Sequence, residues 1–247
     1  MNWPWLTARP IAHRGLHDAA AGCVENTGDA ARAAIARDFA IECDVQLTSD
    51  GEAVVFHDFT LDRLTEATGR LDRHSAAALA AVNFRQCRDH IMSLSDFLKL
   101  IAGRVPLVCE IKSRFDGDMR LADRTLVLAQ AYDGPMALKS FDPQIIAHLR
   151  AGGTRLPLGV IAMATYDAPD WRDVPPPLRQ SMTAFLHFPE TRPDFLSWHV
   201  GDLPHAIPAL LRLGLHLPVM TWTVRSAAQR QTALTYCDQI VFEHIDP

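Results

Sequence analysis

Short apolar runs alternate with amphipathic segments along most of the chain. The runs are rich in Val, Ile, Leu and Phe and have the length of strands, and they cover residues 9–15, 40–48, 52–58, 105–112, 135–141, 156–164, 194–200, 217–224 and 238–244. The segments between them have helical periodicity and helix-boundary residues, and they cover residues 25–39, 94–103, 120–132, 142–153, 203–214 and 226–237. This alternation, repeated about eight times, predicts a parallel sheet covered by helices.

Two segments interrupt the alternation. Residues 61–92 carry many charges and little strand character, so we interpret them as an inserted excursion after the strand that ends at "HD". The stretch 165–180 contains "VPPP", and we expect a loop there.

The chain length decides between two architectures that share this pattern. A chain of 247 residues is long for a bundle or a small sandwich, but it is usual for an α/β barrel that forms one domain. We therefore predict an α/β fold, a (β/α)8 TIM barrel, as a single domain over residues 1–247 with its inserted region at about 61–92.

Composition excludes several classes of protein. A net charge of −5 provides no basic surface for a phosphate backbone, so nucleic acid is not expected as a partner. No apolar run approaches the roughly 18 residues of a membrane-spanning helix. The start of the chain lacks the pattern of a secretory signal. The five cysteines are odd in number and widely spaced, which argues against a disulfide framework or a structural zinc site. A reducing cytoplasm is the expected location, and the pattern leaves the oligomeric state open.

Polar side chains recur near the ends of the predicted strands. Side chains alternate across a strand, so Glu42 and Asp44 share one face, and Glu110 and Lys112 share one face of another strand. Barrel enzymes place their chemistry at the carboxyl ends of the strands. The residues that fall late in their strands and could converge there are His13, Glu42, Asp44, His57, Glu110, Lys112, Ser140 and Trp222.

These residue types together indicate phosphate chemistry. Three carboxylates without cysteine ligands suit one divalent cation, Mg²⁺ or Ca²⁺ or else Mn²⁺. Arg14 and Lys112 would neutralise a phosphate. His13 and His57 provide one group to accept a proton and one to give a proton during cleavage of a phosphodiester.

The motifs in their order resemble the glycerophosphodiester phosphodiesterase family. They are "AHRG", "VENT", "IECDVQLTSDGEAVVFHD", "LDRLTEATG", "CEIK", "KSF" and "TWTV", and together they span essentially the whole chain. The resemblance implies a TIM barrel with a small insert after the second barrel strand. It implies hydrolysis of a small-molecule glycerophosphodiester to sn-glycerol 3-phosphate and an alcohol.

The same resemblance assigns roles to individual residues. It implies a cation held by Glu42, Asp44 and Glu110, with His13 and His57 as the acid/base pair. It implies that Arg14 and Lys112 contact the phosphate and that Asn26 lies beside the metal site. Ser140 and Trp222 are weaker candidates for substrate contact, because Ser also caps helices and Trp is often a core residue.

Departures from the family pattern leave the substrate open. Arg225 stands where Asn is frequent, and the last strand ends in Phe242-Glu243-His244. A lysophospholipid or another phosphodiester is the alternative substrate, favoured if Phe59, Phe115 and Trp198 line one wall of the site. A barrel that binds a metal and a phosphodiester without turnover is a further alternative, although retention of two histidines argues against it.

Overall fold

The computed structural model describes residues 3–247, so residues 1–2 of the predicted domain lie outside the described part. Contacts divide the described chain into two compact units. The amino-terminal unit comprises Ile11–Lys112 and Met119–Met136. The carboxy-terminal unit comprises residues 3–10, Ser113–Asp118 and Ala137–Pro247.

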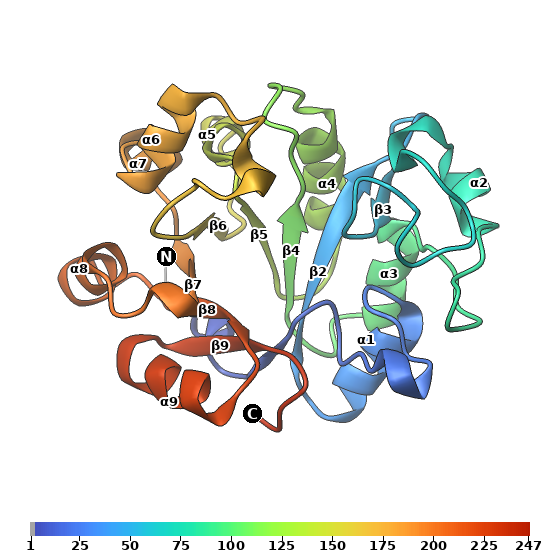
Figure 1. Ribbon diagram of the computed structural model, residues 1–247, viewed down its shortest axis with the longest axis horizontal. Coiled ribbons are helices and arrows are strands. Elements are labelled where there is room, and N and C mark those ends of the chain that lie inside the picture. Colours follow the sequence, from blue (N-terminus) through green and yellow to red (C-terminus); the bar gives the residue numbers. More distant parts are fainter. Residues whose placement is uncertain (1–2) are drawn as a thin grey trace. The chain divides into compact units, whose positions relative to one another are not determined.

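The sheet of the amino-terminal unit is built around β2 (Ala40–Leu47), which pairs in parallel with β1 (Ile11–Ala12) and β4 (Leu107–Ile111). Every residue of β2 except the last is buried, as expected for a strand covered on both faces. The apolar run after the Asp50-Gly51 turn forms β3 (Ala53–Val55), which pairs antiparallel with β2. β3 is therefore a hairpin strand added beside β2 (Figure 1).

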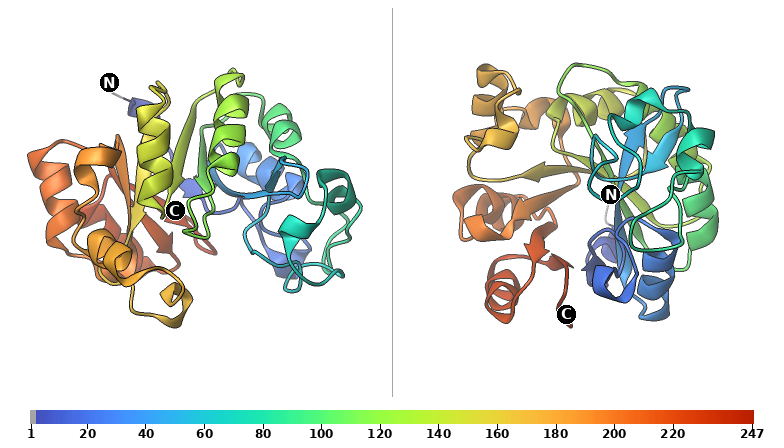
Figure 2. Two further views of the ribbon diagram at one scale, coloured as in Figure 1. Left: turned by 90° about the horizontal axis from the view of Figure 1, so that it is seen from above. Right: turned by 45° about the vertical axis from the view of Figure 1, so that its right-hand side comes forward.

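Three helices of this unit follow from their sequence patterns. They are α1 (Gly28–Ala36), α3 (Leu94–Ile101) and α4 (Arg120–Gln130). Thr27 caps α1 and Ser93 caps α3, because their hydroxyls accept a backbone N–H of the first turn. The buried residues of α3, which are Leu94, Phe97, Leu98 and Ile101, recur every three or four positions and so form one apolar stripe. α1 and α3 lie side by side in the views of Figures 1 and 2.

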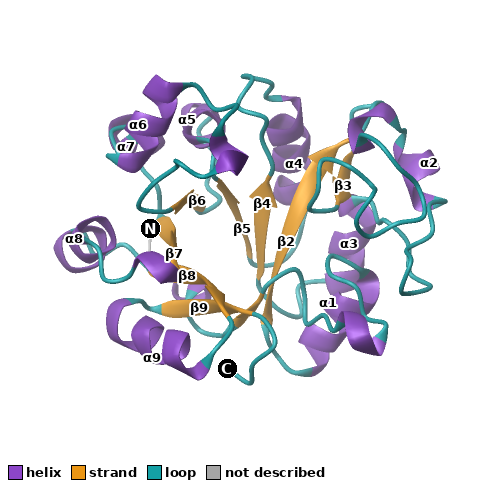
Figure 3. Ribbon diagram, viewed as in Figure 1, coloured by secondary structure: helices purple, strands orange, loops and turns teal. Residues whose placement is uncertain are grey.

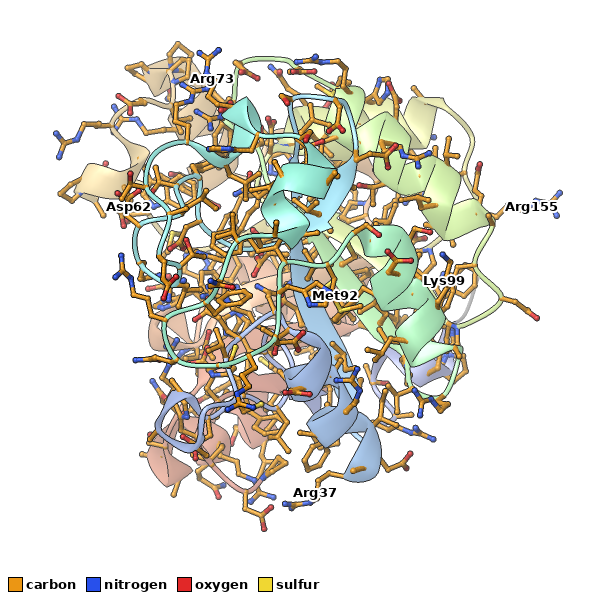
Figure 4. The ribbon with its side chains drawn as sticks, turned by 90° about the vertical axis from the view of Figure 1, so that its right-hand side faces the viewer. Arg37, Asp62, Arg73, Met92, Lys99 and Arg155 are labelled. Atoms are coloured by element: carbon orange, nitrogen blue, oxygen red, sulfur yellow. The ribbon has the colours of Figure 1, made fainter. Side chains whose placement is uncertain are left out.

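The predicted insertion lies between β3 and α3. It contains a short 3-10 turn (Leu71–Arg73) and the helix α2 (Ala76–Ala80), and Figure 3 shows the rest of it as loop. A small core fixes the segment, formed by Val24, Val54, Phe56, Leu61, Leu71, Leu79, Phe84 and Ile91. Figure 4, which labels Asp62 and Arg73, shows the segment from its outer side. The insertion is thus a packed part of the amino-terminal unit.

The carboxy-terminal unit continues the strand and helix alternation. Its strands are parallel, in the order β5 (Met136–Ser140), β6 (Leu158–Ala162), β7 (Phe195–His199), β8 (Val219–Val224) and β9 (Gln239–Phe242). Its helices are α5 (Pro143–Ala151), α6 (Pro176–Thr183), α7 (Phe188–Thr191), α8 (Ala206–Gly214) and α9 (Ala227–Tyr236).

The loop predicted for 165–180 is wrong in its second half. α6 begins at Pro176, and a 3-10 turn covers Pro169–Trp171. The "VPPP" run places prolines at the start of the helix, where the missing N–H has no partner to lose. The run therefore begins a helix here.

The predicted fold class is confirmed. Among the described residues, β1, β2 and β4–β9 are the eight parallel strands of a (β/α)8 TIM barrel, and the insertion follows the second of them. The assignment of residues 1–247 to a single domain stays a prediction. No helix in the described part of the chain is long and apolar enough to cross a membrane.

Acidification is expected to destabilise the protein through His187, which is 8% exposed beside α7. Burial lowers the pKa of His187 from its ordinary 6.5 to about 4. The unfolded chain therefore binds a proton at a higher pH than the folded protein does. Protonation therefore favours the unfolded chain, and it lowers the stability of the folded state by up to about 3 kcal/mol as the pH falls from about 6.5 to about 4.

Urea unfolding of the wild type and of His187→Gln at several pH values checks this expectation. The free energy of unfolding should fall less steeply with acid in His187→Gln than in the wild type. Equal slopes in the two proteins would contradict it.

Candidate active site

Three carboxylates gather where β2 and β4 pair. Asp44 on β2 and Glu110 on β4 are partners in the parallel register, so their side chains leave the sheet at the same level. Glu42 lies two residues before Asp44 and projects from the same face. Each of the three side chains offers an oxygen, and these oxygens lie within 4.8 Å of one another. Glu42 and Asp44 are 0% exposed and Glu110 is 6% exposed.

Two cationic side chains compensate this negative charge. The Lys112 ammonium lies 2.9 Å from Asp44 Oδ1 and donates to Glu110 Oε1 at 2.7 Å. Arg14 Nε lies 3.2 Å from Asp44 Oδ2. Burial alone would raise the pKa of Asp44, but Lys112, His57 and Arg14 more than offset it and hold that pKa well below its ordinary value. The carboxylate is therefore ionised at neutral pH.

Two left-handed residues bring the "AHRG" and "VENT" motifs onto β2. Arg14 has φ 57° and its backbone N–H donates to Glu42 Oε2 at 3.1 Å. Asn26 has φ 58°; its side-chain amide donates to Asp44 Oδ2 at 2.9 Å and its Oδ1 accepts the Asp44 N–H at 3.2 Å. Asn tolerates this conformation better than most residues. Asn26 therefore contacts Asp44 through both ends of its amide, and its place beside a metal or substrate stays a prediction.

Gly15 allows the close approach of this turn to α1. Its φ is +80°, and a Cβ added there would come within 2.8 Å of the backbone of Ala30. Glycine is the residue that satisfies both demands, since it has no Cβ.

The two histidines reach the cluster in different ways. His13 is 7% exposed, and its Nε2 lies 3.9 Å from Glu42 Oε2. His57 follows β3, and its Nδ1 lies 2.7 Å from Asp58 Oδ1. An ionised carboxylate can only accept, so Nδ1 carries the proton and Nε2 is left for proton transfer.

Ser140 and Trp222 belong to the carboxy-terminal unit. Ser140 ends β5, and its hydroxyl accepts the Asp142 N–H at 3.1 Å, while Asp142 itself caps α5. The Trp222 indole donates to the Ser197 carbonyl at 3.1 Å, and its ring meets Phe141 edge-on. Their role in substrate contact stays a prediction.

The suggested apolar wall needs correction. Trp198 is 0% exposed and its ring stacks on His205, so it is a core residue. Phe59 is 37% exposed, and Phe115 packs against Trp171 in an aromatic cluster of the carboxy-terminal unit. The strand pattern placed Trp198 near a strand end, but alternation pointed its side chain into the packed layer.

The carboxylate cluster fits a divalent cation. All of its donors are oxygens, which Mg²⁺, Ca²⁺ and Mn²⁺ prefer. Two oxygens on opposite sides of Ca²⁺ are about 5 Å apart, so three oxygens within 4.8 Å of one another can reach one ion. Glu42, Asp44 and Glu110 are therefore the residues of the amino-terminal unit that could hold such an ion.

The sequence motifs did not assign a role to three residues that contact the site, which are Glu25, Arg63 and Asp58. Glu25 accepts from Arg14 Nη1 at 2.7 Å, and Arg63 donates to both Glu25 and Asp58. The signal was present, since Glu25 lies in "VENT" and Arg63 in "LDRLTEATG". Nothing in the spacing alone predicts that these two motifs meet.

A sequence model of the glycerophosphoryl diester phosphodiesterase family matches residues 13–246. The chain belongs to this family. Curated relatives include glycerophosphodiester phosphodiesterase 1 of Bos taurus and of Homo sapiens, each 49% identical over 63 residues. Those alignments cover 25% of this chain and 18% of the length of each relative.

Solved structures of glycerophosphodiester phosphodiesterases share the fold of this family member. A phosphodiesterase of Oleispira antarctica, in complex with the product sn-glycerol-3-phosphate, has a TM-score of 0.77 at 18% identity, covering 96% of this chain and 93% of its own. A glycerophosphodiester phosphodiesterase of Thermotoga maritima has a TM-score of 0.71 at 19% identity, covering 94% and 92%. At these identities the likeness shows the fold alone.

Removing the ammonium at the cluster should make folding depend on a cation. Lys112→Met leaves Asp44 and Glu110 buried without the charge between them, and breaking a buried ion pair costs about 3–5 kcal/mol. We expect this loss in EDTA, and a substantial recovery when Ca²⁺, Mg²⁺ or Mn²⁺ is added, because binding to the folded state stabilises it.

Urea unfolding with and without each cation measures the effect. Lys99→Met is the matched control, since Lys99 is 74% exposed and pairs with Asp96 on the surface of α3, where such pairs contribute at most about 1 kcal/mol. A Lys112→Met protein that none of the three cations stabilises would argue against a metal site.

Proposed function

We propose that the protein is a metal-dependent phosphodiesterase that hydrolyses glycerophosphodiesters to sn-glycerol 3-phosphate and an alcohol. The supporting observation is the cluster of three buried carboxylates, bordered by Arg14 and Lys112, in a chain of this family. A cluster of that charge composition suits a cation and a phosphate bound together. A cytoplasmic location stays a prediction.

The proposed acid and base are the two histidines of the amino-terminal unit. In the proposal His13 takes the proton from the nucleophile, which is water or the neighbouring glycerol hydroxyl. In this step His57 is doubly protonated: it gives its Nε2 proton to the departing alkoxide, while Nδ1–H stays bonded to Asp58. If the hydroxyl attacks, the first product is a cyclic phosphate, and water then opens it to glycerol 3-phosphate. The reverse assignment of the two roles is the alternative.

In the proposal, N–H groups of Lys112 and Arg14 that do not bond protein carboxylates bind the phosphate. Lys112 has three N–H groups; one donates to Glu110, and the ammonium lies 2.9 Å from Asp44 Oδ1. Arg14 has five N–H groups; one on Nη1 donates to Glu25, and Nε lies 3.2 Å from Asp44 Oδ2. The remaining donors can bind phosphoryl oxygens. A cation held by Glu42, Asp44 and Glu110 would stabilise negative charge on those oxygens.

The choice of alcohol belongs to the carboxy-terminal unit in this proposal. Arg225, which differs from the common family residue, donates to Glu243 at 2.6 Å, so the two departures at this rim are one ion pair. A lysophospholipid is the second candidate substrate, because Phe115 and Phe141, which pack on the aromatic cluster, are only partly buried and could contact an acyl chain. An assay of glycerophosphocholine beside its lysophospholipid separates the two.

Replacement of either histidine should reduce turnover sharply. We expect His13→Ala and His57→Ala each to lower kcat by about 10² to 10⁴, because each removes a proton-transfer group. Release of glycerol 3-phosphate from a panel of glycerophosphodiesters, with Mg²⁺, Ca²⁺ or Mn²⁺ and with EDTA, measures this.

Two controls accompany the assay. Glu42→Gln should abolish the dependence on cation together with the activity, and His148→Ala, at an exposed position of α5, should leave turnover unchanged. Normal turnover in both active-site histidine variants would refute the proposed chemistry. Tight substrate binding without product would favour the binding protein instead.

A further inference from the structure

One guanidinium in the inserted segment contacts two carboxylates at once. Arg63 Nε donates to Asp58 Oδ2 at 2.6 Å and its Nη2 donates to Asp58 Oδ1 at 2.9 Å. Its Nη1 donates to Glu25 Oε2 at 3.0 Å, and Nη2 also reaches Glu25 Oε1 at 2.7 Å. The planar fork is thus bidentate toward both partners.

Each of these carboxylates leads to a residue of the candidate active site. Asp58 holds Nδ1 of His57 at 2.7 Å. Glu25 accepts from Nη1 of Arg14 at 2.7 Å, and Arg14 Nε lies 3.2 Å from Asp44. The guanidinium of Arg63 is therefore the junction between the proposed acid/base group and the proposed phosphate-binding group.

We propose that Arg63 is a positioning residue, which holds His57 and Arg14 in one fixed arrangement by clamping Asp58 and Glu25. The inference rests on the proposed function, because it assigns a task to Arg63 in that reaction. It also gives the inserted segment a role in the active site, since Arg63 is its contribution to the network.

Burial and packing distinguish this contact from an ordinary surface ion pair. The Arg63 side chain is 46% exposed, but the side chains of Glu25 and Asp58 are 12% and 20% exposed. Its backbone is fixed on both sides by Leu61 and Thr65, which are 0% exposed and joined by a bond from the Thr65 hydroxyl to the Leu61 carbonyl. Exposed ion pairs usually contribute little to stability, but a bidentate pair with a fixed backbone inside a network of charges contributes more.

Loss of the Arg63 guanidinium would leave both Asp58, which holds His57, and Glu25, which holds Arg14, less firmly oriented. Without Arg63, the side-chain partner that Asp58 keeps among residues 3–247 is His57, and Glu25 faces Asp58 without a cation between them. Lysine cannot replace the fork, because a single ammonium cannot make two parallel bonds to each of two carboxylates. Small displacements of a catalytic group are enough to lower turnover by about a hundredfold.

The first test compares Arg63→Ala and Arg63→Lys with Arg70→Ala. Arg70 is a matched control, since it lies in the same segment, is 47% exposed and donates to a single carboxylate, Asp72. We expect kcat of both Arg63 variants to fall about 10- to 100-fold with KM changed less than about threefold, and Arg70→Ala to match the wild type. Full activity in Arg63→Lys would overturn the proposal, because charge alone would then suffice.

Chemical rescue tests the guanidinium itself. Arg63 is exposed enough for methylguanidinium to reach its site, so we expect added methylguanidinium to restore the turnover of Arg63→Ala at least severalfold. It should not restore the double variant Glu25→Gln/Arg63→Ala, which lacks one of the two carboxylates. Failure of rescue in the single variant would count against the clamp.

A spectroscopic measurement separates this inference from the proposed function. In the wild type and Arg70→Ala, the Nδ1–H proton of His57 should give a hydrogen-bonded NMR signal, which should weaken or shift in Arg63→Ala. Inactivity of the wild type on every diester would refute the proposed function. The NMR signal would still show whether Arg63 positions His57 through Asp58. An unchanged signal together with unchanged kcat would overturn it. If Arg63→Ala is unfolded by circular dichroism, Arg63→Gln takes its place in each comparison.

Discussion

Compensation of buried negative charge is the constraint on which the amino-terminal unit depends. The parallel register of β2 and β4 places Asp44 beside Glu110, and both are out of water. Two neighbouring carboxylates in such surroundings cannot remain ionised without positive charge. Lys112 supplies that charge from the end of β4 and Arg14 from the turn after β1. A bound cation would supply more of it.

The local backbone follows from the same constraint. Arg14 and Asn26 adopt left-handed conformations, which cost free energy and persist where surrounding contacts fix them. Here the contacts are the Arg14 N–H to Glu42 and the two bonds between Asn26 and Asp44. Farther from the cluster, Arg63 bridges Glu25 and Asp58, so that negative and positive side chains alternate. The inserted segment thereby connects to the site through ion pairs as well as through its own small core.

Much of the fold was predictable because its signals are local. Apolar runs gave the strands, and the caps at Thr27, Ser93 and Asp142 mark helix starts that depend on nearby residues. The start of α6 was mispredicted, since a proline run can open a helix as well as a loop. The antiparallel direction of β3 also needed the structure. Trp198 was misjudged because strand position does not say which layer a side chain enters.

For the site, the sequence by itself determined the residue types: three carboxylates, two histidines, Arg14 and Lys112 within recognisable motifs. Alternation along β2 and along β4 also put Glu42 with Asp44 and Glu110 with Lys112. Only the tertiary structure decided that Asp44 faces Glu110, that Asn26 locks Asp44, and that Arg63 joins Asp58 to Glu25. The physical reason is that strand register and the path of the insertion arise from packing between distant segments, which no local pattern specifies.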